Sequence, residues 1–250
     1  MIAYITGATS GFGYSIAKRL ASLGYNVIVN GRRKHLLEAL CKEIKQLYPV
    51  ETEIACYDVR EQESVFHSVE NLPNQWKDID ILVNNAGLAV GLNSLQNGDI
   101  DDWNRMIDTN LKGVLYVTRA IAPLMTQRGK GHIINIGSIA GKEVYPNGNV
   151  YCATKHAVDA LNKAMRLDML KYGIKVTQIA PGAAETEFSL VRFKGDKKAA
   201  DAVYDGYMPL CAEDIADVVE YLVKLPPHVC INDLTITCLA QANAGNFCKK

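Results

Sequence analysis

The stretch Thr6-Gly7-Ala8-Thr9-Ser10-Gly11-Phe12-Gly13 follows the apolar run at residues 2–5 directly and precedes an amphipathic segment. It therefore joins a strand to a helix. Glycines allow a tight turn and let backbone amides approach an anion at the helix start, where the helix dipole favours negative charge. The spacing is GxxxGxG, not the GxGxxG of the usual dinucleotide fingerprint. A purely structural turn remains an alternative, but the position after the first strand favours a phosphate-binding turn.

Short apolar runs alternate with longer amphipathic stretches along the whole chain. This alternation predicts an α/β fold, a Rossmann-like doubly wound parallel sheet of about seven strands with helices on both faces. The predicted strands are 2–5, 26–29, 53–56, 79–83, 132–136, 175–179 and 234–237. The predicted helices are 15–23, 36–47, 63–72, 102–127 with a break around Asn110, 150–172 and 212–225.

No linker, low-complexity tract or repeat interrupts this pattern, so residues 1–250 are predicted to form a single domain. The segment at about 183–211 is rich in charge and poorly patterned. Because it follows a predicted strand, we expect a loop or a pair of short helices that lies over a site like a lid.

The composition excludes several classes of protein. With 48% hydrophobic residues, the 250-residue chain can bury a sizeable core, and its 27 basic and 27 acidic side chains indicate neither a nucleic-acid nor a membrane partner. No apolar run approaches the roughly 20 residues of a membrane span, and no leader-like segment precedes the first strand. The seven cysteines form no CxxC pair and the five histidines no HxxxH, so we predict reduced thiols, no metal site and a cytoplasmic location.

The end of the second predicted strand indicates which nucleotide would bind. An NAD site holds an acidic residue there for the ribose 2′-hydroxyl, whereas this chain has Gly31 followed by Arg32 and Arg33. Guanidinium groups suit a phosphate, and cations are unfavourable at the start of a helix unless a ligand compensates. The sequence therefore predicts NADP rather than NAD.

Tyr151 and Lys155 lie four residues apart on a predicted helix, so their side chains lie on the same face. A nearby ammonium group lowers the pKa of a phenol from about 10 and makes it a usable acid or base near neutral pH. A solvated helix face is the simpler interpretation of this pair alone. Cys152 and His156 form a rival pair for nucleophilic chemistry, but they lie about 100° around the helix, so both pairs cannot face one cofactor.

Together these motifs resemble the short-chain dehydrogenase/reductase family, over essentially the whole chain and in the expected order. The chain looks most like NADP-dependent 3-hydroxy acid dehydrogenases of the serine or L-allo-threonine dehydrogenase branch. The matching elements are residues 6–13, Asp58-Val59, Asn84-Asn85-Ala86-Gly87, Asn110, Ser138, Tyr151 with Lys155, Pro181-Gly182 and Thr186, with the branch carried by residues 30–33, 148–151 and 186–196.

The resemblance implies that Tyr151 is the catalytic acid/base, that Lys155 lowers its pKa and holds the nicotinamide ribose, and that Ser138 binds the substrate oxygen. It further implies that Asn110 positions a water that links Lys155 to solvent. The cofactor-binding residues it implies are Gly7, Ala8, Thr9, Ser10, Gly11, Phe12, Gly13, Arg32, Arg33, Asp58, Val59, Asn85, Ala86, Gly87, Tyr151, Lys155, Pro181, Gly182, Ala183, Ala184, Glu185 and Thr186.

A 3-hydroxy acid needs a cationic or amide-lined pocket for its carboxylate, and Arg192 and Lys194 in the lid-like segment are the candidates, with Arg192 favoured for its fork geometry. Ser138 is the candidate for binding the hydroxyl. The resemblance implies a homotetramer with contacts through the helices at roughly 110–127 and 150–172. Two other functions remain open: a 3-ketoacyl or general carbonyl reductase, and a non-catalytic NADP(H)-binding regulator.

Overall fold

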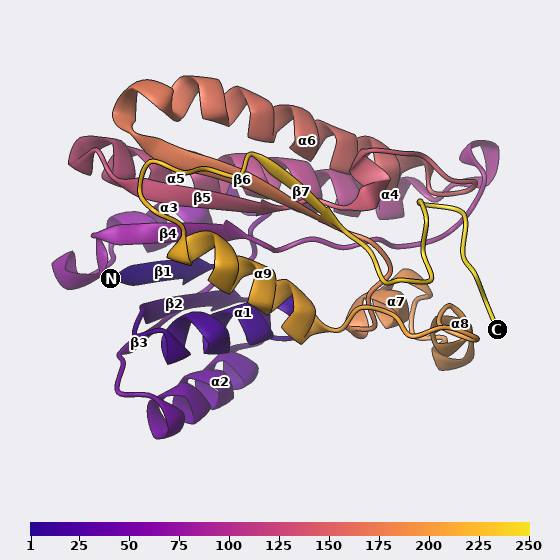
Figure 1. Cartoon of the computed structure of the whole chain (residues 1–250), viewed down its shortest axis with the longest axis horizontal. Helices are drawn as coiled ribbons and strands as arrows, with labels where there is room; N and C mark the ends of the chain where they lie inside the picture. Colours follow the sequence, from indigo (N-terminus) through magenta and orange to yellow (C-terminus); the bar gives the residue numbers. More distant parts are fainter.

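The computed structural model describes residues 1–250 and contains one sheet with helices on both faces (Figure 1). Seven strands pair in the order β3-β2-β1-β4-β5-β6-β7, and every neighbouring pair is parallel. The strands are β1 Ile2–Ile5, β2 Asn26–Gly31, β3 Thr52–Cys56, β4 Ile79–Asn84, β5 Gly131–Ile136, β6 Ile174–Pro181 and β7 Asp233–Ile236. The strand order reverses between β1 and β4, and in such sheets ligands bind beyond the carboxyl ends of the strands at this reversal.

Two layers of helices cover the sheet because successive strand residues point to opposite faces. In β1, Ala3 and Ile5 pack under α1, α2 and α9, whereas Ile2 and Tyr4 pack under α3, α5 and α6 (Figure 1). The helices are α1 Gly11–Ser22, α2 Lys34–Leu47, α3 Gln62–Glu70, α4 Ile100–Ile107, α5 Gly113–Arg128, α6 Asn149–Met169, α7 Glu187–Arg192, α8 Lys197–Ala202 and α9 Ala212–Lys224. None of them combines the length and the apolar composition that a bilayer crossing requires.

The predicted fold class is confirmed, with all seven strands close to their predicted positions. Helix α1 starts at Gly11 rather than Ser15, because the glycine turn itself supplies the first turn of the helix. The predicted break around Asn110 is a π-helical turn, Asp108–Lys112, between α4 and α5. Such turns insert one extra residue into a helix and frequently mark functional positions.

The segment that follows β6 contains the two short helices α7 and α8 before the chain enters α9 (Figure 1). The C-terminal residues pass over this region and end beside it. Lys250 donates its backbone N–H to the carbonyl of Gly206 at 2.9 Å, and the rings of Tyr207 and Phe247 pack at a tilt with centroids 5.0 Å apart. The C-terminus is thus fixed to the segment that follows α8.

Candidate active site

A cavity of about 550 Å³ opens at the carboxyl ends of the central strands, where the strand order reverses. It extends from the glycine turn after β1 to α7. The sequence-predicted residues that line it are Gly7, Thr9, Ser10, Gly11, Phe12, Arg32, Arg33, Asp58, Val59, Asn85, Ala86, Gly87, Ser138, Tyr151, Lys155, Pro181, Gly182, Ala183, Ala184, Thr186 and Arg192. Five predicted residues do not line it: Ala8, Gly13, Asn110, Glu185 and Lys194.

The glycine turn has the backbone that an anion site requires. Gly7 and Gly11 adopt φ values of 66° and 54°, in the left-handed region that favours glycine. A Cβ at Gly13 would lie 2.3 Å from the carbonyl oxygen of Gly7, so only glycine fits where α1 crosses the turn. Asn85, directly after β4, holds the glycine turn in place, because its Nδ2 donates to the carbonyls of Thr6 at 2.8 Å and Gly7 at 3.2 Å. Asn85 thus supports the site as well as lining it.

Arg33 is held against the glycine turn. Its Nη2 donates to the Thr9 hydroxyl at 2.9 Å and to the Ser10 hydroxyl at 3.0 Å, and it contacts Glu187 of α7 at 3.1 Å. A Cβ at Gly31 would lie 2.6 Å from Cγ2 of Thr9, so an acidic side chain could not be placed at Gly31 without moving this threonine. The structure therefore adds a steric reason for the missing acid to the electrostatic one.

Asp58 and Val59 follow β3 and line the same end of the cavity. Arg60 donates to both oxygens of Asp58, through Nε at 3.1 Å and Nη2 at 2.8 Å. Burial raises the pKa of Asp58, but these hydrogen bonds outweigh it and lower the pKa overall. Arg32 lies 3.5 Å from the same carboxylate and is mostly exposed. Asp58 therefore orients Arg32 toward the cavity and stays ionised.

Ser138, Tyr151 and Lys155 come together at the other end of the cavity, from the turn after β5 and the start of α6. The Lys155 ammonium lies 6.0 Å from the centre of the Tyr151 ring and donates to the carbonyl of Ile136 at 2.9 Å. The Ser138 hydroxyl accepts from the backbone N–H of Ala140 at 3.1 Å and donates to the carbonyl of Pro181 at 3.5 Å. All three side chains are buried.

Burial controls the pKa values of Tyr151 and Lys155. It raises the pKa of Tyr151 well above its ordinary value, although hydrogen bonding with Ser138 and the charge of Arg192 act in the opposite direction. Burial also lowers the pKa of Lys155 to about 8. The direction for Tyr151 is the reverse of the one expected from a neighbouring lysine, because withdrawing the phenol from water disfavours its anion more than the nearby cations favour it.

Asn110 lies beside the cavity in the π-helical turn rather than in its wall. Its side chain accepts from the backbone N–H of Leu88 and donates to the Leu88 carbonyl, both at 2.8 Å, and donates to the Thr154 hydroxyl at 3.1 Å. It thereby fixes α6 to the loop after β4. A Cβ at Gly87 would lie 3.3 Å from Oδ1 of Asn110 and 3.5 Å from Nζ of Lys155, so glycine keeps this approach to Lys155 open.

Arg192, at the end of α7, points into the cavity among three aromatic rings. Its guanidinium carbon lies 5.2 Å from the ring centre of Tyr151, 5.5 Å from that of Tyr145 and 5.6 Å from that of Phe188. It donates to the Tyr145 hydroxyl, while its Nε is buried without a partner. An arginine fixed in this way presents a cation directly beside Tyr151.

Lys194 occupies a different place. Its ammonium lies 2.7 Å from the buried carboxylate of Asp102 and 3.4 Å from that of Asp99, at the start of α4. Of the two cations predicted to bind a substrate carboxylate, only Arg192 lines the cavity. Lys194 instead fastens the end of α7 to α4.

The cavity wall also contains residues that the sequence did not indicate, among them Tyr145 and Gln241. Tyr145 lies in an irregular loop with no motif, and Gln241 lies in the C-terminal segment, which also carries no motif. The Gln241 side chain turns inward, and its Oε1 accepts from the backbone N–H of Ala183 at 2.8 Å. A Cβ at Gly182 would lie 2.1 Å from that oxygen, so the glycine was the one available signal of a close neighbour.

The rival pair Cys152 and His156 does not form a nucleophile. His156 Nδ1 contacts the backbone carbonyl of Cys152 at 2.9 Å and not its thiol. Burial raises the pKa of Cys152, which disfavours a reactive thiolate. Neither side chain lines the cavity.

Comparison with known proteins agrees with this geometry. The short chain dehydrogenase family model matches residues 1–196. The chain is 44% identical over 247 residues to the NADP-dependent 3-hydroxy acid dehydrogenase YdfG of Escherichia coli (strain K12), covering 98% of each chain. It is 45% identical over 240 residues to the sulfoacetaldehyde reductase of Chromohalobacter salexigens, covering 96% of this chain and 94% of the relative.

Among solved structures, the closed form of serine dehydrogenase complexed with NADP+ superposes with a TM-score of 0.94 at 43% identity, covering 100% of both chains. The agreement thus extends beyond the family model to the lid-like segment and the C-terminus. This chain belongs to the short-chain dehydrogenase family.

Proposed function

We propose that this protein is an NADP-dependent oxidoreductase that interconverts the C3 hydroxyl and carbonyl of short 3-hydroxy acids, such as serine, allo-threonine or 3-hydroxypropionate, with Tyr151 as acid/base. The observation that carries the proposal is the Arg192 guanidinium 5.2 Å from the Tyr151 ring centre in the cavity. A cation at this place selects a substrate whose reacting carbon lies close to an anionic group.

The cavity residues fit NADP. The left-handed glycines and the free start of α1 suit a pyrophosphate, while Arg33, fixed by Thr9 and Ser10, suits a 2′-phosphate. Asp58 and Val59 would flank the adenine, and Asn85, Ala86 and Gly87 would line the cofactor cleft after β4. The nicotinamide end would contact Pro181, Gly182, Ala183, Ala184 and Thr186. When bound, the cofactor donates or accepts the hydride, and the protein supplies placement and proton handling.

Proton transfer would occur at the Tyr151 hydroxyl. Its raised pKa keeps the phenol protonated at neutral pH, which suits donation to a carbonyl oxygen in reduction. Ser138, whose oxygen already accepts from Ala140, would donate to the same oxygen as negative charge develops there. Lys155 would supply positive charge below its pKa of about 8, and Asn110 would hold the helix that carries both Lys155 and Tyr151.

The anion of the substrate can be a carboxylate or a sulfonate. Malonic semialdehyde and sulfoacetaldehyde both carry an aldehyde one methylene from the anionic group, so one cation beside Tyr151 would orient either. The sequence similarity to dehydrogenases named for 3-hydroxy acids and to reductases named for sulfoacetaldehyde supports this wider substrate class.

We further propose a homotetrameric assembly, a cytoplasmic location and a single domain. A homotetramer is supported by exposed apolar side chains on the two long helices and just after the second, with exposed fractions of 40% for Leu115 of α5, 75% for Leu167 of α6 and 72% for Leu170 in the turn after α6. A cytoplasmic location is supported by seven unpaired cysteines. One continuous sheet supports a single domain for residues 1–250.

Replacing Arg33 by Ala should weaken the binding of NADPH but not that of NADH. Loss of a charge-assisted bond to phosphate removes about 1.5 to 3 kcal/mol, so we expect the Kd for NADPH to rise roughly 10- to 100-fold. Binding of NADH, which lacks the phosphate, should change little. Fluorescence titration of both nucleotides measures this, with Lys34→Ala as a control for loss of one nearby positive charge. An equal loss of affinity for both nucleotides would contradict the role of Arg33 in binding the 2′-phosphate.

A spectrophotometric panel tests the proposed function directly. NADPH and NADH are each offered with malonic semialdehyde, sulfoacetaldehyde, a neutral aldehyde of equal length and a 3-ketoacyl thioester, and NADP+ with the 3-hydroxy acids. We expect kcat/KM with NADPH and the anionic aldehydes to exceed all other combinations by at least about 10-fold. Preference for the thioester would identify a ketoacyl reductase, and NADPH binding without turnover would indicate a regulator.

A further inference from the structure

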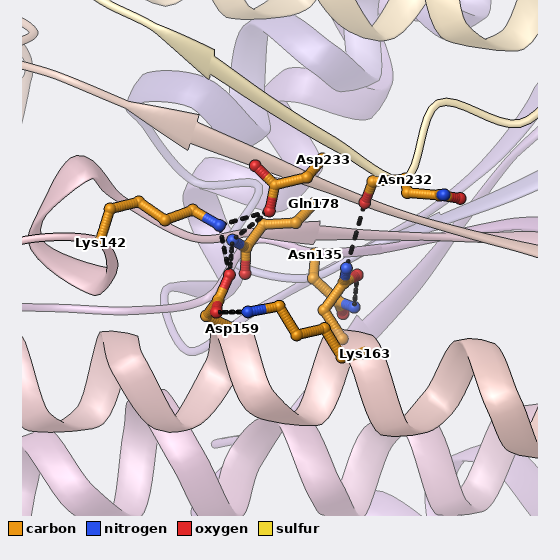
Figure 2. Close-up of polar contacts among 8 residues, drawn as sticks. Asn135, Lys142, Asp159, Lys163, Gln178, Asn232 and Asp233 are labelled. Carbon is orange, nitrogen blue, oxygen red and sulfur yellow. Dashed lines mark hydrogen bonds and ion pairs between the residues drawn. The ribbon is translucent and has the colours of Figure 1, made fainter.

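A cluster of charged side chains outside the cavity joins the turn that carries Ser138 to helix α6 (Figure 2). Lys142 follows the single 3-10 turn Ile139–Gly141 directly after Ser138. Its ammonium contacts Asp159, one helical turn after Lys155 on α6, and Asp233 at the start of β7. One cation thus links three separate segments of the chain.

The other members of the cluster fix the two carboxylates. Gln178 of β6 is fully buried and donates its Nε2 to Asp159 at 2.9 Å and to Asp233 at 3.1 Å. Lys163, one turn further along α6, pairs with the second oxygen of Asp159 at 2.5 Å and is largely exposed (Figure 2). Burial raises the pKa of Asp159, but these three partners outweigh it and lower the pKa to about 2. Asp159 therefore remains an anion at any working pH.

The turn and the helix are in direct contact inside this cluster. A Cβ at Gly141 would lie 2.6 Å from the carbonyl oxygen of Lys155, and one at Gly137 would lie 2.8 Å from the side chain of Gln178. Gly141 thus rests on α6, which carries Asp159, and Gly137 rests on Gln178 of β6, which donates to Asp159. A small movement of the Lys142 end of the turn would change the separation of Ser138 from Tyr151.

We propose that Lys142 is a positioning residue, whose ammonium bridges Asp159 and Asp233 and sets the position of the Ser138 hydroxyl relative to Tyr151 and Lys155. This inference rests on the proposed catalytic roles of those three residues. Lys142 itself lies outside the cavity wall. Its removal should therefore affect the reaction rate rather than the binding of the nucleotide.

The test compares Lys142→Met with Lys142→Arg, which keeps a cation able to bridge two carboxylates. Since displacement of a reacting group by less than 1 Å costs up to 100-fold in rate, we expect Lys142→Met to lower kcat roughly 10-fold. The KM for NADPH should stay within about twofold, and Lys142→Arg should recover most of kcat. Asp233→Asn, which removes one carboxylate and leaves Asp159 in place, should lower kcat about threefold even if Lys142→Met does not fold.

Lys163→Met is the matched control, because it removes a cation from the same carboxylate without touching the Ser138 turn, and its kcat should equal the native value. An unchanged kcat in Lys142→Met, or an equal loss in Lys142→Arg, would overturn the inference if Tyr151→Phe is inactive in the same assay. Activity retained in Tyr151→Phe would instead show that the proposed function itself is wrong, and the inference would fall with it.

Discussion

Replacing Tyr151 by Phe should abolish nearly all turnover while leaving NADPH binding intact. The substitution removes one hydroxyl from a buried ring that still packs against Phe188, with ring centroids 5.6 Å apart, so the fold should be retained. General acid–base catalysis contributes roughly 100- to 10,000-fold to a rate, and kcat should fall by that factor. Stopped-flow oxidation of NADPH gives kcat, and fluorescence titration gives the Kd of the nucleotide.

Cys152→Ala is the control for this substitution, because Cys152 is buried next to Tyr151 on α6 but lies outside the cavity wall. Its kcat should remain within about threefold of the native value. The native reduction rate should also fall above pH 8, as Lys155, with its pKa lowered to about 8, loses the charge it holds at lower pH. A kcat of Tyr151→Phe close to the native value, or a large loss of kcat in Cys152→Ala, would contradict the acid/base role.

The fold could be predicted from the sequence because each part of it has a local cause. Buried parallel strands are short apolar runs, and the amphipathic helices between them have a different period. A break around Asn110 in the helical stretch 102–127 was also predicted from the sequence. The break is a π-helical turn in which the Asn110 side chain bonds to Leu88 and Thr154. This geometry could not be predicted from the sequence, because both partners are distant along the chain.

The electrostatics of the site could not be predicted in the same way. Spacing along α6 places Lys155 beside Tyr151, but the pKa of a phenol depends on how much water surrounds it, and burial is a property of the whole fold. The roles of the two lid cations depend likewise on contacts between distant segments. Lys194 pairs with Asp102 of α4, and Arg192 donates to Tyr145. No local sequence pattern predicts either contact.

Replacing Arg192 by Ala should raise the KM for anionic substrates far more than for neutral ones. The guanidinium lies among the rings of Tyr145, Tyr151 and Phe188, where little water screens its charge. A charge-assisted hydrogen bond there is worth about 3 kcal/mol, so KM for malonic semialdehyde or sulfoacetaldehyde should rise roughly 100-fold. KM for a neutral aldehyde of equal length should change less than about threefold.

Lys194→Met is the matched control, because it removes a cation from the same lid-like segment at a place outside the cavity. Loss of its bond to Asp102 should loosen α7 and raise KM for anionic and neutral aldehydes by the same modest factor. Arg192→Lys should recover only part of the anionic preference, since an ammonium lacks the planar fork that binds two oxygens. If Arg192→Ala raised KM equally for both classes, Arg192 would serve only to hold the lid against Tyr145, and the substrate would not be selected by its charge.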